Sequence, residues 1–133
     1  MEKRIYYHDT DAGGVVYYGR YLNYLEEART EFLEEHGLSV KMFHEQGVLY
    51  AVRRCSVEYR FPARYGDTLI CRAKLKKITA AQMIFEQTIH DKKLNRLIVE
   101  AEVTLVCLNK EFKPTGIPEE LKNKLEREGI LNE

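Results

Sequence analysis

The segment from Leu49 to Leu108 alternates between apolar and polar residues with a period of two, and this pattern constrains the fold more than any other feature of the chain. Alternating residues point to opposite faces of a β-strand, so the pattern predicts strands with one buried face. Turn-forming residues divide the segment at Pro62, at Gly66-Asp67 and at residues 91–95. We expect four strands joined by short turns as an antiparallel meander, over residues 49–61, 68–78, 81–89 and 96–108.

Before these strands the period changes to that of a helix. Apolar residues recur at intervals of four, three and four positions, at Tyr21, Leu25, Ala28 and Phe32. With glutamates mostly off this stripe, the spacing predicts a long helix with one buried face, from about residue 17 to a stop at Gly37. Two short helices are expected over residues 39–46 and 118–128.

One long amphipathic helix and one sheet bury both apolar faces when the helix packs across the concave side of a curved sheet. The sequence therefore predicts an α+β fold in two layers, with about five strands and a single domain over residues 1–133. The long strands leave sheet edges that must be protected, so we expect a homodimer or a larger homo-oligomer.

Charge balance and apolar run length exclude some classes of function and location. The 21 basic residues balance 21 acidic residues, which argues against a nucleic-acid partner. The longest apolar run, Val48 to Val52, is far shorter than the ~20 residues of a membrane span. The N-terminus lacks the apolar region of a secretory signal. An odd number of cysteines in apolar patterns, Cys55, Cys71 and Cys107, predicts buried thiols in a reducing compartment, so we expect a cytoplasmic protein.

The first candidate for chemistry is the loop Asp9-Thr10-Asp11-Ala12-Gly13-Gly14, which leads into the long helix. It is either a helix-leading turn or a site with a catalytic carboxylate. We expect no metal there, because a hard-cation site needs more oxygen ligands than the following residues offer. Unpaired amides at a helix start stabilise a developing oxyanion, and the glycines leave room for a ligand. A carboxylate beside them is suited to acyl chemistry.

Other residues carry weaker signals. The four histidines lack metal-ligand spacing, and no nucleotide-binding glycine motif is present, so we expect no cofactor. Several basic residues are either solvated or bind the phosphates of a nucleotide-containing substrate: Arg53, Arg54, Arg60, Arg64, Lys76 and Lys77. Tyrosines gathered around the loop and the helix start either pack in the core or line a tunnel.

Two segments, residues 6–18 (YYHDTDAGGVVYY) and residues 21–31 (YLNYLEEARTE), resemble the signature of hotdog-fold acyl-CoA thioesterases. The resemblance is specifically to the YbgC-like branch, near 4-hydroxybenzoyl-CoA thioesterase. Residues 57–59, 62–63, 66–67 and 100–103 are also similar to that family, so the resemblance covers nearly the whole chain. It implies hydrolysis of an acyl-CoA to a free acid and CoA, by a hotdog fold assembled as a homodimer or homotetramer.

The resemblance also implies roles for single residues. Asp11 corresponds to the family's catalytic carboxylate, acting as nucleophile or as general base on water. The Tyr18 backbone N–H corresponds to the donor that polarises the thioester carbonyl; the YbgC-like branch usually carries His there and the hydroxybenzoyl branch Tyr. To substrate binding we assign Asp9, Gly13, Gly14, Val16, Tyr17, Arg60, Lys76 and Lys77.

Two rival functions stay open on the same fold. One is a dehydratase or hydratase, although the long helix offers only His36, at its far end. The other is a module that binds an acyl carrier protein or a cell-envelope complex without turnover, because YbgC-like proteins are associated with cell-envelope systems. The sequence also leaves open the acyl chain, the choice between CoA and acyl carrier protein, and the choice between dimer and tetramer.

Overall fold

The computed structural model describes residues 1–127 and contains the predicted helices and strands. In chain order these are β1 (Glu2–Arg4), the 3₁₀-helix η1 (Tyr7–Asp9), α1 (Arg20–Glu35), α2 (Val40–Glu45), β2 (Leu49–Tyr59), β3 (Thr68–Ile78), β4 (Gln82–Asp91), β5 (Leu97–Leu108) and α3 (Glu119–Arg127). The long helix and all four predicted strands are confirmed. Residue 128, the end of the last predicted helix, lies outside the described residues.

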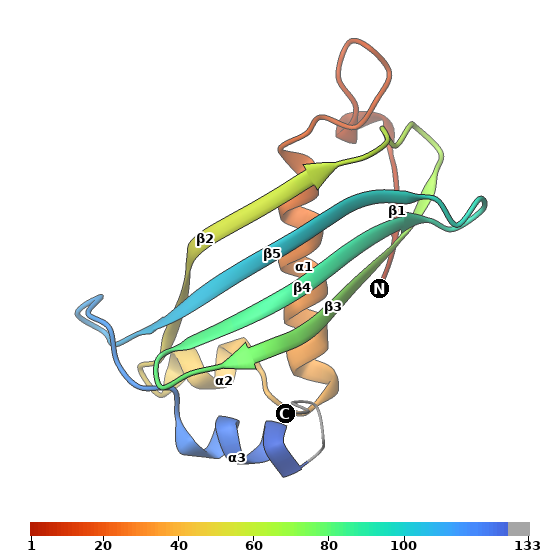
Figure 1. Ribbon diagram of the computed structural model, residues 1–133. Helices are drawn as coiled ribbons and strands as arrows, with labels where there is room; N and C mark the ends of the chain where they lie inside the picture. Colours follow the sequence, from red (N-terminus) through yellow and green to blue (C-terminus); the bar gives the residue numbers. More distant parts are fainter. Residues whose placement is uncertain (128–133) are drawn as a thin grey trace.

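The strands form one antiparallel sheet in the order β1-β3-β4-β5-β2. The prediction of a meander through all four long strands was therefore wrong, because β2 pairs with β5 and not with β3. The chain leaves β2 at one edge and crosses the end of the sheet through residues 60–67 to begin β3 near the other edge (Figure 1). Only β3, β4 and β5 follow one another as hairpins.

Helix α1 lies across one face of the sheet, as predicted (Figure 1). Its apolar stripe, with Tyr21, Leu25 and Ala28, is buried against residues such as Leu69 and Ile89 from the strands. A second cluster at the other end of the sheet joins the C-terminal part of α1 with α2 and α3. The site described below lies at the first end, where the chain enters α1.

A buried polar contact fixes α1 on the sheet. Arg29 of α1 is 8% exposed, and one of its guanidinium N–H groups donates to Gln87 Oε1 of β4 at 3.0 Å. The Gln87 side-chain amide donates in turn to the Leu25 carbonyl at 2.9 Å. Burial lowers the pKa of Arg29. This pair sets the position of α1, because a displaced helix would leave buried polar groups unpaired.

Strand β2 departs from the predicted pattern. The pairing with β5 shifts between Val52 and Arg54, so a bulge inverts the predicted alternation in the first half of the strand, where Tyr50 and Val52 lie opposite buried residues of β5. Cys55 keeps its predicted face, opposite the buried Val103, but on this edge strand the described chain leaves it uncovered. Cys55 is exposed, whereas Cys71 and Cys107 are buried. The prediction of three buried thiols is therefore wrong for Cys55. Val52 is 53% exposed, so this edge strand presents apolar surface on the isolated chain.

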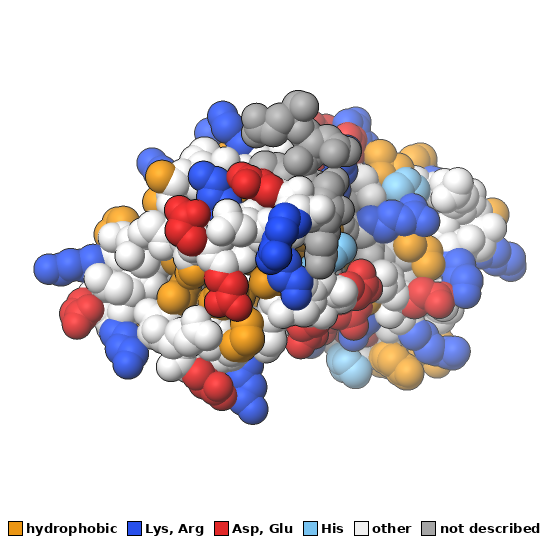
Figure 2. Space-filling view, turned by 90° about the horizontal axis from the view of Figure 1, so that it is seen from below, with side chains coloured by type: hydrophobic (Ala, Val, Ile, Leu, Met, Phe, Trp, Pro, Cys, Tyr) orange, Lys and Arg blue, Asp and Glu red, His pale blue; other side chains and the backbone are white. Residues whose placement is uncertain are grey.

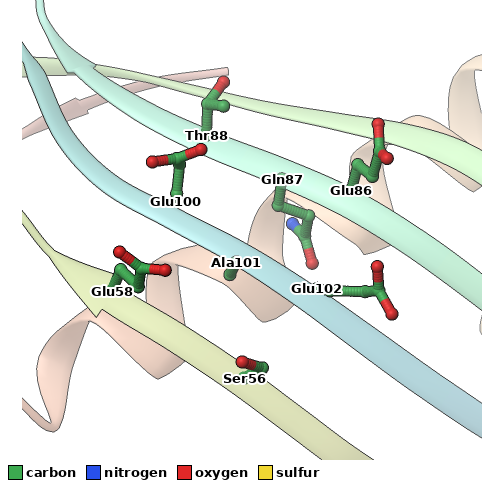
Figure 3. Close-up of a pocket in the computed structure, with 8 residues that line it drawn as sticks. All are labelled: Ser56, Glu58, Glu86, Gln87, Thr88, Glu100, Ala101 and Glu102. Atoms are coloured by element: carbon green, nitrogen blue, oxygen red, sulfur yellow. The ribbon is translucent and has the colours of Figure 1, made fainter.

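Four glutamates project from the outer face of the sheet, which is the face turned away from α1 (Figure 3). Glu86 faces Glu102 across the strands, and Glu58 faces Glu100. One cation joins each pair. Lys76 Nζ lies 3.6 Å from Glu86 and 3.0 Å from Glu102. Arg60 lies 2.9 Å from Glu58 and 2.7 Å from Glu100.

The surface carries both signs of charge, as the balanced composition predicts. Basic and acidic side chains are interspersed over the end of the molecule shown in Figure 2, without a large region of one sign. None of the helices within residues 1–127 combines the length and apolar character that crossing a membrane requires.

Candidate active site

The loop before α1 is a closed hairpin. Thr10 and Val16 form an isolated bridge, and the Asp11 N–H donates to the Val15 carbonyl at 2.9 Å. The Gly14 N–H donates back to the Asp11 carbonyl at 3.0 Å. Gly14 has a φ of +78°, which favours glycine at this turn. The loop projects from the end of the domain, where the chain enters α1 (Figure 1).

Asp11 presents its carboxylate at the surface of this loop. The side chain is exposed, and Oδ1 accepts a hydrogen bond from the Gly13 N–H at 2.8 Å. A Cβ on residue 13 would lie 3.2 Å from that oxygen. Glycine at position 13 therefore allows the carboxylate to sit where it does.

Asp9 lies beneath the loop. It is 2% exposed, and its Oδ2 accepts a hydrogen bond from the Tyr6 N–H at 2.9 Å. Its Oδ1 lies 4.0 Å from Arg20 Nε. Burial and, after it, the neighbouring Asp9 raise the pKa of Tyr24. These contacts fix the start of the loop, and the substrate-binding role assigned to Asp9 stays a prediction.

The chain enters α1 through a turn that leaves two amides free. The Tyr17 N–H donates to the Asp9 carbonyl at 3.0 Å, and the Arg20 N–H donates to the Tyr17 carbonyl at 2.9 Å. Within residues 1–127, the N–H groups of Tyr18 and Gly19 have no hydrogen-bond acceptor. Helix-start amides carry partial positive charge, so they suit a carbonyl oxygen that gains negative charge.

Aromatic side chains surround this turn. The Tyr17 and Tyr18 rings lie 4.8 Å apart, and the Tyr18 ring lies 6.4 Å from that of Tyr59. The Tyr21 hydroxyl accepts a hydrogen bond from the Ala63 N–H at 3.0 Å, and burial raises its pKa. The tyrosines therefore divide between core packing (Tyr21) and exposed surface beside the turn (Tyr17, Tyr18).

A mostly apolar groove of about 400 Å³ begins at Gly19 and runs between α1 and β2. We call it the α1–β2 groove; its walls are Gly19, Leu22, Asn23, Leu25, Glu26, Arg29, Val52, Cys55 and Val103. None of these residues was predicted from the sequence to belong to a site. The sequence feature that could have indicated this groove is Leu22, an apolar residue that lies off the buried stripe of the helix.

The structure brings most predicted site residues together. Gly13, Gly14, Val16 and Tyr17 belong to the loop and the turn, and Val16 is buried, with its N–H donating to the Ala63 carbonyl at 2.8 Å. A small pocket of about 260 Å³ places Arg60 beside Tyr18 and Val16, although the Arg60 guanidinium is paired with two glutamates.

Lys76 and Lys77 lie elsewhere. Both sit near the end of β3 that is next to α2, whereas the loop with Asp11 lies by the start of that strand (Figure 1). Lys76 is also held by two glutamates. Within a single chain, then, the structure does not bring these two lysines to Asp11. Their role in phosphate binding stays a prediction.

These groups define the chemistry that the site can perform. An exposed carboxylate, two unpaired amides at a helix start and an apolar groove converge where the chain enters α1. Such a set suits attack by the carboxylate on the carbonyl carbon of an acyl group. The amides would hold the carbonyl oxygen, and the apolar chain of the acyl group would lie in the groove.

Comparison with known proteins agrees with this set. A family model described as the thioesterase-like superfamily matches residues 6–125. The acyl-CoA thioester hydrolase YbgC of Escherichia coli is 39% identical over 119 residues, which are 89% of this chain and 88% of the relative. The acyl-CoA thioesterase YbgC of Haemophilus influenzae is 34% identical over 121 residues, 90% of this chain and 88% of the relative.

Solved structures agree as well. The crystal structure of a probable thioesterase from Bartonella henselae superposes with a TM-score of 0.83 at 29% identity, over 89% of this chain and 97% of that chain. The predicted hotdog fold is confirmed, and the fold and the matches together define a thioester hydrolase. The chain belongs to the thioesterase-like superfamily.

Proposed function

We propose that this protein hydrolyses an acyl-CoA thioester to a free carboxylic acid and CoA, with Asp11 as the catalytic carboxylate. The observation that carries the proposal is the exposed Asp11 side chain in a loop that leads directly to the unpaired amides of Tyr18 and Gly19. The similarity to acyl-CoA thioester hydrolases over most of the chain supports the choice of substrate.

The reaction needs few groups. The Tyr18 N–H holds the thioester carbonyl oxygen and stabilises the negative charge that develops on it. Asp11 either removes a proton from a water that attacks the carbonyl carbon, or attacks that carbon itself. In both cases a C–O bond forms and the C–S bond breaks; in the second case water then hydrolyses the mixed anhydride, which releases the acid and restores the Asp11 carboxylate. Because an ordinary thiol has a pKa of about 8.5, the sulfur leaves as a thiolate without a strong general acid.

The acyl chain is placed by the α1–β2 groove. This groove begins at Gly19, next to the proposed oxyanion donor, and Leu22, Leu25 and Val52 give it apolar walls. An acyl group whose carbonyl oxygen lies at the Tyr18 amide therefore has an apolar path beside α1. Arg29, Glu26 and Asn23 supply polar atoms along the same path.

We also propose that the protein assembles through the edge of its sheet. Strand β2 is an edge strand, paired only on the side of β5, and Val52 and Cys55 lie exposed on it. Pairing of two β2 edges would join two sheets and cover this surface, so we expect a homodimer or homotetramer. The cytoplasmic location and the association with an acyl carrier protein or a cell-envelope complex stay predictions.

The test is thiol release from a panel of short, long and aromatic acyl-CoAs, with the matching acyl carrier protein thioesters in parallel. The proposal expects turnover of at least one acyl-CoA. Binding of thioesters without thiol release would favour the non-catalytic binding module. Conversion of an enoyl-CoA to a hydroxyacyl-CoA with the thioester intact would favour the hydratase.

A further inference from the structure

A groove of about 780 Å³ at the active-site end of the molecule lies between two segments that are far apart in sequence. We call it the basic groove. One wall comes from residues 62–68, which connect β2 with β3, and the other from residues 91–96, which connect β4 with β5. Four cationic side chains line it, against two carboxylates: Arg64, Lys92, Lys93 and Arg96, against Asp67 and Asp91.

Both carboxylates are engaged by backbone amides of their own turns. Asp67 Oδ2 accepts a hydrogen bond from the Arg64 N–H at 2.8 Å, and Asp91 Oδ1 accepts one from the Lys93 N–H at 2.9 Å. These bonds shape the two turns that form the walls. The carboxylates keep their charge, so the lining of the groove carries four positive charges against two negative ones, a positive excess that attracts anions.

Three of the four cations form no ion pair with the residues that the structure describes. Lys92 Nζ lies 2.6 Å from Glu2 Oε1, so its charge is matched. Among residues 1–127, by contrast, the side chains of Arg64, Lys93 and Arg96 form no ion pair. On a chain with equal numbers of acidic and basic residues, this concentration of unmatched positive charge needs an explanation. Phosphate groups are the anions that guanidinium forks bind best.

The groove also offers flat apolar surface. Tyr65 lines it and is 59% exposed, with its ring held edge-on by Tyr7 at 5.7 Å. The Arg96 guanidinium lies over the Phe61 ring, 4.6 Å from its centre, which orients that cation. Exposed aromatic rings beside arginines are typical of sites that stack a nucleobase.

The basic groove is joined to the Asp11 loop through the backbone. Val15 forms an isolated bridge with Arg64, and the Val16 N–H donates to the Ala63 carbonyl. The same loop carries Asp11. A molecule with a thioester at one end and phosphates at the other can therefore reach both places along one stretch of surface.

We infer that the basic groove binds the 3′-phosphorylated adenosine diphosphate end of CoA, with Arg64 and Arg96 on the phosphates and Tyr65 against the adenine ring. This inference rests on the proposed function, because it takes acyl-CoA as the substrate. It replaces the paired cations Arg60 and Lys76 with unpaired cations as the phosphate ligands.

Calorimetric titration with CoA and with adenosine 3′,5′-bisphosphate tests the groove without any turnover. The test variant is the double substitution Arg64→Ala with Arg96→Ala, and the matched control is Arg72→Ala, an exposed arginine of β3 that does not line the groove. We expect the double variant to weaken both ligands at least tenfold and to reduce the salt dependence of binding, with the control unchanged. Unchanged affinity in the double variant, or equal losses in the control, would overturn the inference.

Kinetics separate this inference from the proposed function. If both hold, the double variant raises KM for an acyl-CoA and leaves turnover of the matching acyl-pantetheine, which lacks the nucleotide, unchanged. Loss of activity on both substrates would contradict the groove as a nucleotide site. If the wild type turns over neither substrate, the proposed function fails, and the titration alone still decides whether the groove binds the nucleotide.

Discussion

The Gly13 amide donates a hydrogen bond of 2.8 Å to the carboxylate of Asp11, the residue two positions before it. This contact orients the carboxylate from within its own loop, so the position of Asp11 depends on the local backbone. It also explains a glycine at position 13, because a Cβ there would come within 3.2 Å of the same oxygen.

Gly13→Ala should therefore impair catalysis without unfolding the protein. The added methyl group pushes the Asp11 oxygen by a few tenths of an ångström. A misplaced catalytic group costs rate steeply, and we expect kcat to fall roughly tenfold. Steady-state kinetics on the best acyl-CoA measure this. Gly116→Ala is the control, since its new Cβ would lie 3.6 Å from the Ala80 carbonyl, an ordinary contact. Equal activity of the two variants would contradict the role of Gly13.

Gln87→Leu should destabilise the fold. The substitution leaves the Arg29 guanidinium buried without its acceptor and removes the donor to the Leu25 carbonyl. We expect the free energy of unfolding to fall by about 1–3 kcal/mol. Urea unfolding measures it. Gln82→Leu, on the same strand but with no side-chain hydrogen bond among residues 1–127, should change stability much less. A similar loss in both would show that the Arg29 contact contributes little.

Lys76→Met should affect stability in a pH-dependent way. Its hydrogen bond to Glu102 raises the pKa of Lys76 above 10.5. A raised pKa means that the pair stabilises the fold fully below pH 10.5 and loses that contribution as pH rises through the folded-state pKa. The variant should therefore be less stable than the wild type at neutral pH, and the difference should shrink at alkaline pH.

Urea titrations at neutral pH and above pH 10.5 measure that difference. Lys77→Met is the control, because Lys77 is the next residue and makes no ion pair within residues 1–127. If the difference in free energy of unfolding between the wild type and Lys76→Met stays constant across this range, the ion pairs of Lys76 with Glu86 and Glu102 are not its cause.

Val52→Asp should weaken self-association. Val52 is 53% exposed on the β2 edge, and a carboxylate there opposes pairing of two apolar edges. Sedimentation velocity should show a homodimer or tetramer for the wild type and monomer for the variant. Val40→Asp, an equivalent change on the exposed side of α2, should keep the wild-type assembly. A wild type that sediments as a monomer, or a variant that stays assembled, would remove β2 as the interface.

Local signals explain how much of the fold the sequence predicted. The bounds of β3 and the turn at residues 91–95 were correct, because Gly66-Asp67 and the polar residues of that turn interrupt a period that is itself local. The placement of β2 was wrong, because strand order depends on contacts between residues far apart in sequence. Cys55 lies on the predicted face, opposite the buried Val103, yet it is exposed because β2 is an edge strand, which also depends on contacts between distant residues.

The candidate site divides in the same way. Asp11 and the Tyr18 amide belong to one continuous segment, so their proximity to a helix start was readable from the sequence. The basic groove was missed because Arg64 and Arg96 meet only through the pairing order of the sheet. Arg60 and Lys76 were assigned to phosphate binding because they are basic, but in the structure both are paired with glutamates.

The measurement that tests the central claim most directly is the kcat of Asp11→Asn on the acyl-CoA that the wild type hydrolyses best, with circular dichroism to verify the fold. Asparagine keeps an oxygen that the Gly13 amide can bond, so the loop should persist while the carboxylate is lost. Because the carboxylate is the only group assigned to attack the carbonyl or to activate water, we predict a loss of at least ~10²-fold in kcat. A folded Asp11→Asn variant with wild-type kcat would contradict the account.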